Sequence, residues 1–304
     1  MKHWIQAFRL RTLPLAVSSI LVGSALAYVA DHFRYSGPGQ FKPIVLVLAL
    51  VTAILLQVLS NLANDLGDHQ HGTDNKDRIG PQRAVQSGAI SPSAMKRAMF
   101  ICGALTFISG SALITVGLGL TSTTLLFLLL GLVAIGAAVK YTFGKNPYGY
   151  AGLGDISVFL FFGIVGVLGT FYLHTRFFYW PGLLPAAAFG LLSTGVLNVN
   201  NMRDIANDAA SGKRTLVVRM GSDKARVYHT ALVVGGLVCL AVITAAMGQW
   251  QPWLFLLITP GFAIHLKRVW TTTDPRALDP QLKVLAMGTF ATALLFSLGL
   301  ILAA

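Results

Sequence analysis

Nine long apolar stretches follow one another along the chain, and they constrain its fold more than any other feature. Each has roughly 18 to 25 residues, enough to cross about 30 Å of hydrocarbon as an α-helix. The predicted spans cover residues 13–30, 43–67, 98–119, 122–141, 153–173, 181–204, 227–247, 252–270 and 284–303. The sequence therefore predicts an all-α, polytopic membrane protein with nine transmembrane helices, which form a single domain over residues 1–304.

The positive charge of the chain indicates its orientation in a membrane and not a nucleic-acid partner. The chain is 55% hydrophobic and 11% charged, and its formal net charge is +12. If the N-terminus is cytoplasmic, the only Lys and Arg residues that fall on the outer side are Arg34, Lys42 and Arg176. The positive-inside rule predicts this bias. We therefore expect the N-terminus and the basic loops in the cytoplasm and the C-terminus outside, with no nucleic acid as partner.

The first dozen residues, MKHWIQAFRLRT, alternate basic and aromatic positions before Pro14 begins the first span. Such a segment is typical of a helix that lies flat on the membrane interface. The apolar length of the first span and the eight spans that follow favour an uncleaved helix over a signal peptide.

All eleven acidic residues are Asp, and six of them gather at the inner ends of the second and sixth predicted spans. The first cluster has the spacing i, i+3, i+4 and i+7 of one helical face, in Asn61, Asn64, Asp65 and Asp68. The second has the spacing i, i+4 and i+8, in Asn200, Asp204 and Asp208. Two helices are thus predicted to present oxygen ligands at the same membrane depth.

Magnesium suits such a pair of stripes. Facing carboxylates repel one another unless a cation neutralises them. Mg²⁺ takes oxygen ligands, and it commonly combines one or two carboxylates with substrate phosphate oxygens. Neither cluster contains Cys, and His69 and His71 fit a solvated loop better than a metal site. The alternative is that both clusters only cap helices that emerge into water. Their matching positions favour a site.

A basic loop that contains Gly follows each cluster, and its cations are candidates for binding phosphate: Arg78, Arg83, Lys213 and Arg214. The positive-inside bias alone could also place cations there. Carboxylates that hold Mg²⁺ beside cations that hold phosphate predict a diphosphate site at the membrane boundary, with an apolar tail between the helices.

At these residues the sequence resembles the intramembrane prenyltransferases of the UbiA superfamily. Members carry an NDxxD motif on the second helix and a DxxxD motif on the sixth, which correspond here to Asn64, Asp65, Asp68 and to Asp204, Asp208. The resemblance spans essentially the whole chain. Three blocks look more narrowly like the branch that prenylates 1,4-dihydroxy-2-naphthoate in menaquinone synthesis: residues 60–81, 146–163 and 200–221.

The resemblance implies a Mg²⁺-dependent enzyme of the bacterial inner membrane, surrounded by lipid, with a central cavity open to the cytoplasmic side. It would transfer an all-trans polyprenyl group from polyprenyl diphosphate to 1,4-dihydroxy-2-naphthoate with loss of CO₂, giving demethylmenaquinone. One alternative is a sister prenyltransferase with another aromatic acceptor, such as 4-hydroxybenzoate. A more distant one is an Asp-lined transporter, which predicts acids near the membrane midplane.

The resemblance also assigns roles. The metal ligands are Asn64, Asp65, Asp68, Asn200, Asp204 and Asp208, and the four Asp residues among them are catalytic. The substrate-binding residues are Asn61, Asn64, Arg78, Arg83, Asn200 and Lys213. Tyr141 is expected to face the allylic cation, and Asp155 to act as a base or orienting group, or equally to cap its helix.

The chain departs from the family pattern at two positions. Gly72 stands where many relatives have a third Asp, so the role of Asp74 stays open. Asp155 stands where this branch often has Glu, and its shorter side chain changes the reach of the carboxylate.

Overall fold

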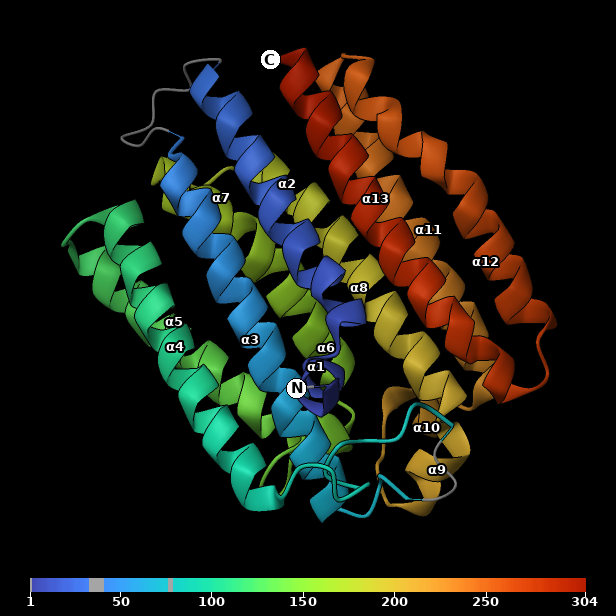
Figure 1. Cartoon of the computed structure of the whole chain (residues 1–304). Coiled ribbons are helices and arrows are strands. Elements are labelled where there is room, and N and C mark those ends of the chain that lie inside the picture. Colours follow the sequence, from blue (N-terminus) through green and yellow to red (C-terminus); the bar gives the residue numbers. More distant parts are fainter. Residues whose placement is uncertain (1, 33–40, 76–78) are drawn as a thin grey trace.

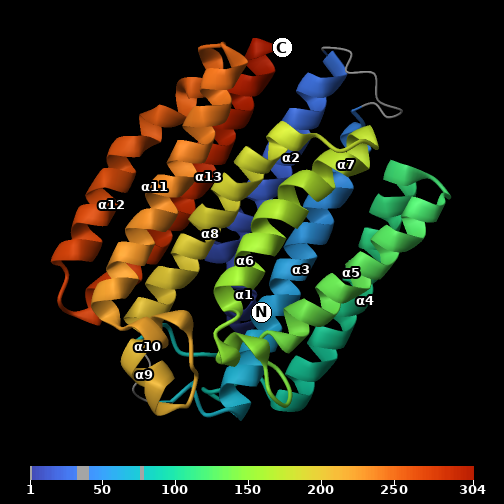
Figure 2. The same cartoon turned by 180° about the vertical axis from the view of Figure 1, so that it is seen from behind.

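The computed structural model of the chain describes residues 2–32, 41–75 and 79–304. Within these residues every regular element is a helix, as predicted, and the long helices run side by side in one bundle (Figure 1). Eight of them are long and apolar enough to cross a membrane. The view from behind shows the same arrangement (Figure 2).

The first half of the chain forms α1 (Lys2–Phe8), η1 (Leu10–Thr12), α2 (Leu13–His32), α3 (Pro43–Gln70), α4 (Pro92–Leu118) and α5 (Ser122–Lys140). The middle forms η2 (Tyr148–Ala151), α6 (Gly154–Val158), η3 (Phe159–Gly169), α7 (Thr170–Thr175), η4 (Trp180–Gly182) and α8 (Leu183–Arg203). The last part forms α9 (Ile205–Ala210), α10 (Leu216–Met220), α11 (Ser222–Met247), η5 (Gln251–Ile258), α12 (Thr259–Thr271), η6 (Pro275–Leu278) and α13 (Asp279–Ala303).

Local sequence signals set where the spans begin. Pro43 is the first residue of α3, where its missing N–H costs no helical hydrogen bond. Ser91 caps α4 by accepting a hydrogen bond from the Ala94 N–H, and Thr121 and Thr124 form a capping box at the start of α5. These signals mark the first turns of three spans, α3, α4 and α5.

Eight of the nine predicted spans coincide with the eight apolar helices. The ninth, residues 252–270, is formed by η5 and α12, which pack against α13. This segment is not among the eight, because its second half carries polar residues that include His265, Lys267 and Arg268. The total of nine transmembrane helices therefore stays a prediction.

The fifth span is continuous but changes helix type, running from α6 through the π-helix η3 into α7. Gly163 on η3 lies against α8 so closely that a Cβ there would come within 2.5 Å of the Ala186 carbonyl oxygen. Gly190 on α8 in turn lies against Phe159. This close approach packs η3 directly against the first half of α8.

Burial identifies the centre of the bundle. In the most apolar window of α8, 72% of residues are buried, compared with 6% in α5, which lies at the edge. The loops after α3 and α8 meet at one end of the bundle, where α9 and α10 lie (Figure 1). The C-terminus lies at the opposite end of the bundle (Figure 1).

Candidate active site

The two Asp-rich segments come together at the end of the bundle that carries α9 and α10. The Asn207 side chain of α9 donates a hydrogen bond to the Thr73 carbonyl oxygen at 2.8 Å, which ties the second segment to the loop after the first. The carboxylates of Asp68 and Asp204 are both near enough to raise the pKa of Asp208 by charge repulsion. The predicted convergence of the two segments is therefore present in the structure.

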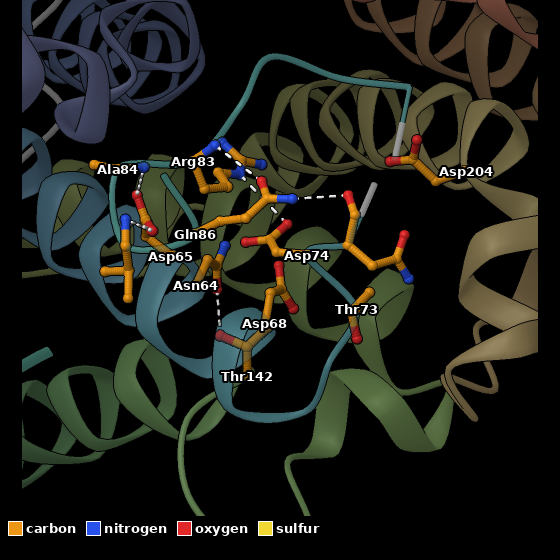
Figure 3. A network of polar contacts seen from close by, with 12 residues as sticks. Asn64, Asp65, Asp68, Thr73, Asp74, Arg83, Ala84, Gln86, Thr142 and Asp204 are labelled. Carbon is orange, nitrogen blue, oxygen red and sulfur yellow. Dashed lines mark hydrogen bonds and ion pairs between the residues drawn. The ribbon is translucent and has the colours of Figure 1, made fainter. Parts of the chain in front are cut away.

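On α3 the predicted stripe contacts several different neighbours (Figure 3). The Asn64 side-chain oxygen Oδ1 accepts a hydrogen bond from the Thr142 hydroxyl at 2.7 Å. The Asp65 carboxylate accepts from the backbone N–H groups of Ala84 and Val85 at 3.2 and 3.1 Å. Asp65 thus secures the loop that follows α3. Its role as a metal ligand stays a prediction, because both of its oxygens already accept hydrogen bonds within the chain.

Asp68 points into the space between the two segments. Its Oδ1 accepts a hydrogen bond from the Tyr150 hydroxyl at 2.8 Å. That hydroxyl also lies 2.6 Å from the Thr73 hydroxyl. Since Tyr150 has only one hydroxyl proton, Thr73 must donate to Tyr150 while Tyr150 donates to Asp68. The chain of hydrogen bonds holds Asp68 in one orientation.

The Lys213 ammonium interacts with the carboxylates of both Asp68 and Asp208. Its Nζ lies 3.5 Å from Asp208 Oδ1 and 5.3 Å from the centre of the Tyr150 ring. Its positive charge also stabilises the ionised Asp68 carboxylate, as do those of Arg83 and Arg9. The predicted phosphate-binding Lys213 therefore stands between the two Asp-rich segments.

Asp208 is buried, and burial is the main cause that raises its pKa, to about 6. The Lys213 ammonium opposes this shift, whereas the carboxylates of Asp204 and Asp68 add to it. Asp208 Oδ2 is buried without a hydrogen-bond partner. A second cation at this oxygen would relieve the repulsion among the three carboxylates.

The second stripe does not lie on one continuous helix, so this prediction was wrong. Helix α8 ends at Arg203, and Asp204 has φ −99° and ψ 8°, a break before α9 begins. The break lets Asp204 turn back onto the Arg203 guanidinium, which donates to both of its carboxylate oxygens. The same guanidinium donates to Asn200 at 3.0 Å and to Asp279 of α13 at 2.5 Å. Asn200 and Asp204 therefore both contact one buried arginine.

Sequence reasoning missed the role of Arg203, whose side chain is 1% exposed. The available signal was an arginine at the end of an apolar span directly before Asp204. Its cation was assigned to the topology bias alone. Nothing in the sequence distinguished Tyr150 from Tyr141 as the partner of Asp68.

The loop after α3 brings further charges into the site. Gly72 adopts a left-handed conformation with φ 72°, and the N–H groups of Thr73 and Asp74 then donate to the Asp68 carbonyl oxygen. Asp74 is buried, with one carboxylate oxygen 3.9 Å from Arg83 Nε. Asp74 and Arg83 therefore lie at the same end of the bundle as Asp68 (Figure 3). Arg78 falls outside the described residues.

Tyr141 and Asp155 lie near the carboxylates. Gly154 leaves room for the Tyr141 ring, because a Cβ there would lie 2.8 Å from the Tyr141 hydroxyl oxygen. The acidic groups that act on this hydroxyl include Asp155, Asp68 and Asp208. Asp155 is buried in the first turn of α6, and the Tyr228 hydroxyl is among the groups near its carboxylate. Tyr141 thus lies near both Asp155 and the diphosphate-binding candidates.

Within the described residues, no three His, Cys, Asp or Glu side chains gather closely enough to hold a metal ion by themselves. His71 contacts the Gly144 carbonyl oxygen at 3.0 Å, and its ring packs beside the Tyr150 ring. The carboxylates of Asp68 and Asp208, with the buried Oδ2 of Asp208, still fit Mg²⁺. They fit the form of site in which a few carboxylates and substrate phosphate oxygens share the ion.

Comparisons with known proteins agree with this arrangement. The profile of the UbiA prenyltransferase family matches residues 15–302. A 1,4-dihydroxy-2-naphthoate octaprenyltransferase of Escherichia coli is 47% identical over 98% of this chain and 95% of that protein. The protein of the same name from Mycobacterium tuberculosis is 38% identical over 83% of this chain and 80% of its own length.

Solved structures share the fold. The apo structure of a UbiA homolog from Aeropyrum pernix has a TM-score of 0.71 at 16% identity and covers 97% of this chain and 98% of its own. A UbiA homolog from Archaeoglobus fulgidus bound to DMAPP and Mg²⁺ has a TM-score of 0.51 at 16% identity, over 95% of this chain and 98% of its own.

Proposed function

The chain belongs to the UbiA prenyltransferase family, and on this basis we propose that it is a Mg²⁺-dependent polyprenyltransferase of the membrane. It transfers an all-trans polyprenyl group from polyprenyl diphosphate to 1,4-dihydroxy-2-naphthoate and releases CO₂, which gives the reduced (quinol) form of demethylmenaquinone. The choice of acceptor is supported by the names of relatives that align with almost the whole chain.

One observation carries the proposal: the Lys213 ammonium lies between the carboxylates of Asp68 and Asp208 at the end of an apolar bundle. Carboxylates beside a cation suit a ligand that combines Mg²⁺ with phosphate oxygens. The surrounding helices supply the apolar surface that a prenyl tail needs. A transporter would not require the basic loop residues that accompany these acids.

The residues divide the work of binding the donor. Asp68 and Asp208 would hold Mg²⁺, which when bound neutralises charge that develops on the leaving diphosphate. Lys213 and Arg83 bind the phosphate oxygens, Lys213 as a point charge and Arg83 through its planar guanidinium. Tyr150 keeps Asp68 oriented. The predicted roles of Asn64, Asp65, Asn200, Asp204 and Arg78 belong to the same proposal.

The acceptor occupies the side of the site near α6. The face of Tyr141 is placed to stabilise the allylic cation, and Asp155 with Tyr228 orients the acceptor hydroxyl. As the bond between the prenyl carbon and the diphosphate oxygen breaks, a ring carbon of the acceptor forms a bond to that prenyl carbon. The carboxylate on the same ring carbon then leaves as CO₂, which restores the aromatic ring.

We assign the protein to the bacterial cytoplasmic membrane, with the site and the N-terminus on the cytoplasmic side. The support is the distribution of Lys and Arg, which concentrates at the end of the bundle that carries the site. A substrate with a charged head group would then enter from the cytoplasm while its tail stays in the lipid.

The test is turnover by the purified protein in lipid nanodiscs. The donor is an all-trans polyprenyl diphosphate, and the acceptor is 1,4-dihydroxy-2-naphthoate or 4-hydroxybenzoate, each with Mg²⁺ or with EDTA. We expect Mg²⁺-dependent prenylation and CO₂ release with the naphthoate alone. Product from 4-hydroxybenzoate would overturn the acceptor, and the absence of product from both would overturn the assignment as an enzyme of this class.

A further inference from the structure

The turn between α1 and α2 has a backbone conformation that its sequence does not favour. Arg9 has φ 50° and ψ 58°, in the left-handed region that suits glycine. The turn is closed by hydrogen bonds from the Thr12 N–H and hydroxyl to the Arg9 carbonyl oxygen, at 2.9 and 3.0 Å. An arginine kept in this conformation suggests that its side chain has a specific destination.

Asn61 on α3 fixes the position of this turn. Its amide nitrogen donates to the Phe8 carbonyl oxygen at 2.9 Å and to the Thr12 hydroxyl at 3.1 Å. The Gln57 side-chain amide nitrogen, one helical turn earlier, donates to the Asn61 side-chain oxygen Oδ1 at 3.2 Å and lies 3.3 Å from the same Thr12 hydroxyl. Asn61 is 2% exposed, so its amide is committed to the N-terminal segment.

The turn lies on the face of α3 that carries Asp68, because Asn61, which holds the turn, stands two helical turns before Asp68. The Arg9 guanidinium is one of three cations that act on the Asp68 carboxylate, together with Lys213 and Arg83. Each of the three comes from a different segment: the turn after α1, the loop after α3 and the loop after α9. Three cations from three segments near one carboxylate suit a ligand with several negative charges.

We propose that Arg9 binds the diphosphate of the prenyl donor, and that Asn61 is a positioning residue that docks the turn from which Arg9 reaches it. This inference rests on the proposed function for the identity of the ligand. It gives Asn61, predicted from the sequence as a substrate-binding residue, an indirect role. It also gives the N-terminal helix a function, because α1 and the donor site are connected through one docked turn.

Glycine separates the charge of Arg9 from its backbone conformation. Arg9→Gly keeps the left-handed turn accessible and removes the guanidinium, whereas Arg9→Lys keeps a charge without the planar fork. We expect Arg9→Gly to raise the KM for the prenyl diphosphate at least tenfold, and Arg9→Lys to raise it less. Arg11→Gln is the matched control, because Arg11 lies in the same segment with an exposed side chain.

A double-mutant cycle tests the role of Asn61. Asn61→Ala should raise the KM for the donor without changing the Mg²⁺ concentration that gives half-maximal activity. Adding it to Arg9→Gly should cause little further increase, because the guanidinium that it positions is already gone. A normal KM in Arg9→Gly contradicts the proposal. Additive effects, or a higher Mg²⁺ requirement in Asn61→Ala, contradict the positioning role.

Calorimetric binding of Mg²⁺ with inorganic pyrophosphate, without acceptor, separates this inference from the proposed function. Weaker binding in Arg9→Gly supports the role of Arg9 even if the wild-type protein prenylates neither acceptor. Equal binding in the variant and the wild-type protein overturns the role of Arg9 even if the wild-type protein turns over the naphthoate. Since Arg9→Gly removes only a side chain from a turn, the test does not depend on whether Asn61→Ala folds.

Discussion

The two Asp-rich segments meet at one site but hold their carboxylates differently. On α3, Asp65 and Asp68 accept hydrogen bonds from neutral donors, which are two backbone N–H groups and the Tyr150 hydroxyl. After α8, Asp204 accepts both of its hydrogen bonds from the Arg203 guanidinium. A neutral donor orients a carboxylate and leaves its charge in place, whereas an arginine cancels that charge.

This difference divides the work within the site. Asp68 and Asp208 lie beside Lys213 without the two-fold arginine pairing that Asp204 makes, so more of their charge is available to a metal ion. Asp204 belongs to a buried ion pair with Arg203, which ties α8 to Asp279 at the start of α13. The resemblance to known prenyltransferases assigns all these Asp residues one role. The contacts in this chain suit Asp68 and Asp208 to binding a cation, and they suit Asp204 with Arg203 to maintaining the shape of the site.

The largest expected effect is on catalysis and comes from replacing Asp68. Asp68→Asn keeps the size of the side chain and removes its charge, so we expect turnover to fall roughly 10³-fold or more, which corresponds to about 4 kcal/mol. The protein should still insert and elute as a single species in size-exclusion chromatography. Steady-state turnover with the prenyl diphosphate measures the loss.

Asp223→Asn is the control for that experiment, because Asp223 is exposed on α11 and pairs only with Arg226 among the ion pairs observed. Its turnover should equal that of the wild-type protein. Substantial activity in Asp68→Asn would remove Asp68 from the metal site and end the contrast between the two segments.

The second effect is on stability and comes from Arg203. Arg203→Met leaves Asp204 and Asp279 without their shared cation, and removing one partner of a buried ion pair costs about 3–5 kcal/mol. We expect a marked drop in the temperature at which the protein aggregates in detergent. Arg226→Met is the matched control, since the exposed pair with Asp223 is worth at most about 1 kcal/mol. Equal aggregation temperatures of the two variants would show that the ion pairs of Arg203 do not stabilise the fold.

The transmembrane helices were predictable because lipid leaves a chain few alternatives. Long apolar stretches located eight of the spans, and the matching depth of the acid clusters predicted that Asp68 and Asp208 converge. The break at Asp204 was not predictable, because i, i+4 spacing assumes a continuous helix and the Arg203 side chain beside the break pairs with Asp279, 76 residues later in the chain. The partners of Asp65 and Arg9 likewise come from remote segments, which spacing along one helix cannot reveal.

The third effect compares two carboxylates of the second segment in the metal-free protein. Asp204→Asn weakens the ion pair with Arg203, so we expect it to lower stability by about 1–3 kcal/mol. Asp208→Asn removes a buried charge that is repelled by Asp204 and Asp68. We expect it to leave stability unchanged or to raise it. Thermal unfolding in EDTA measures both, and the reverse order of stability would contradict the division between the two roles.

The smallest effect concerns the hydroxyl that orients Asp68. Tyr150→Phe keeps the ring below Lys213 and removes the donor to Asp68, a hydrogen bond worth about 1 kcal/mol. We expect turnover to fall about fivefold, with a modest rise in the Mg²⁺ requirement. Tyr148→Phe is the control, because its hydroxyl contacts Ala137 and Ser157 and not the site carboxylates. If both variants behave alike, neutral hydrogen bonding does not set the orientation of Asp68, and its position must come from Lys213 and the other cations instead.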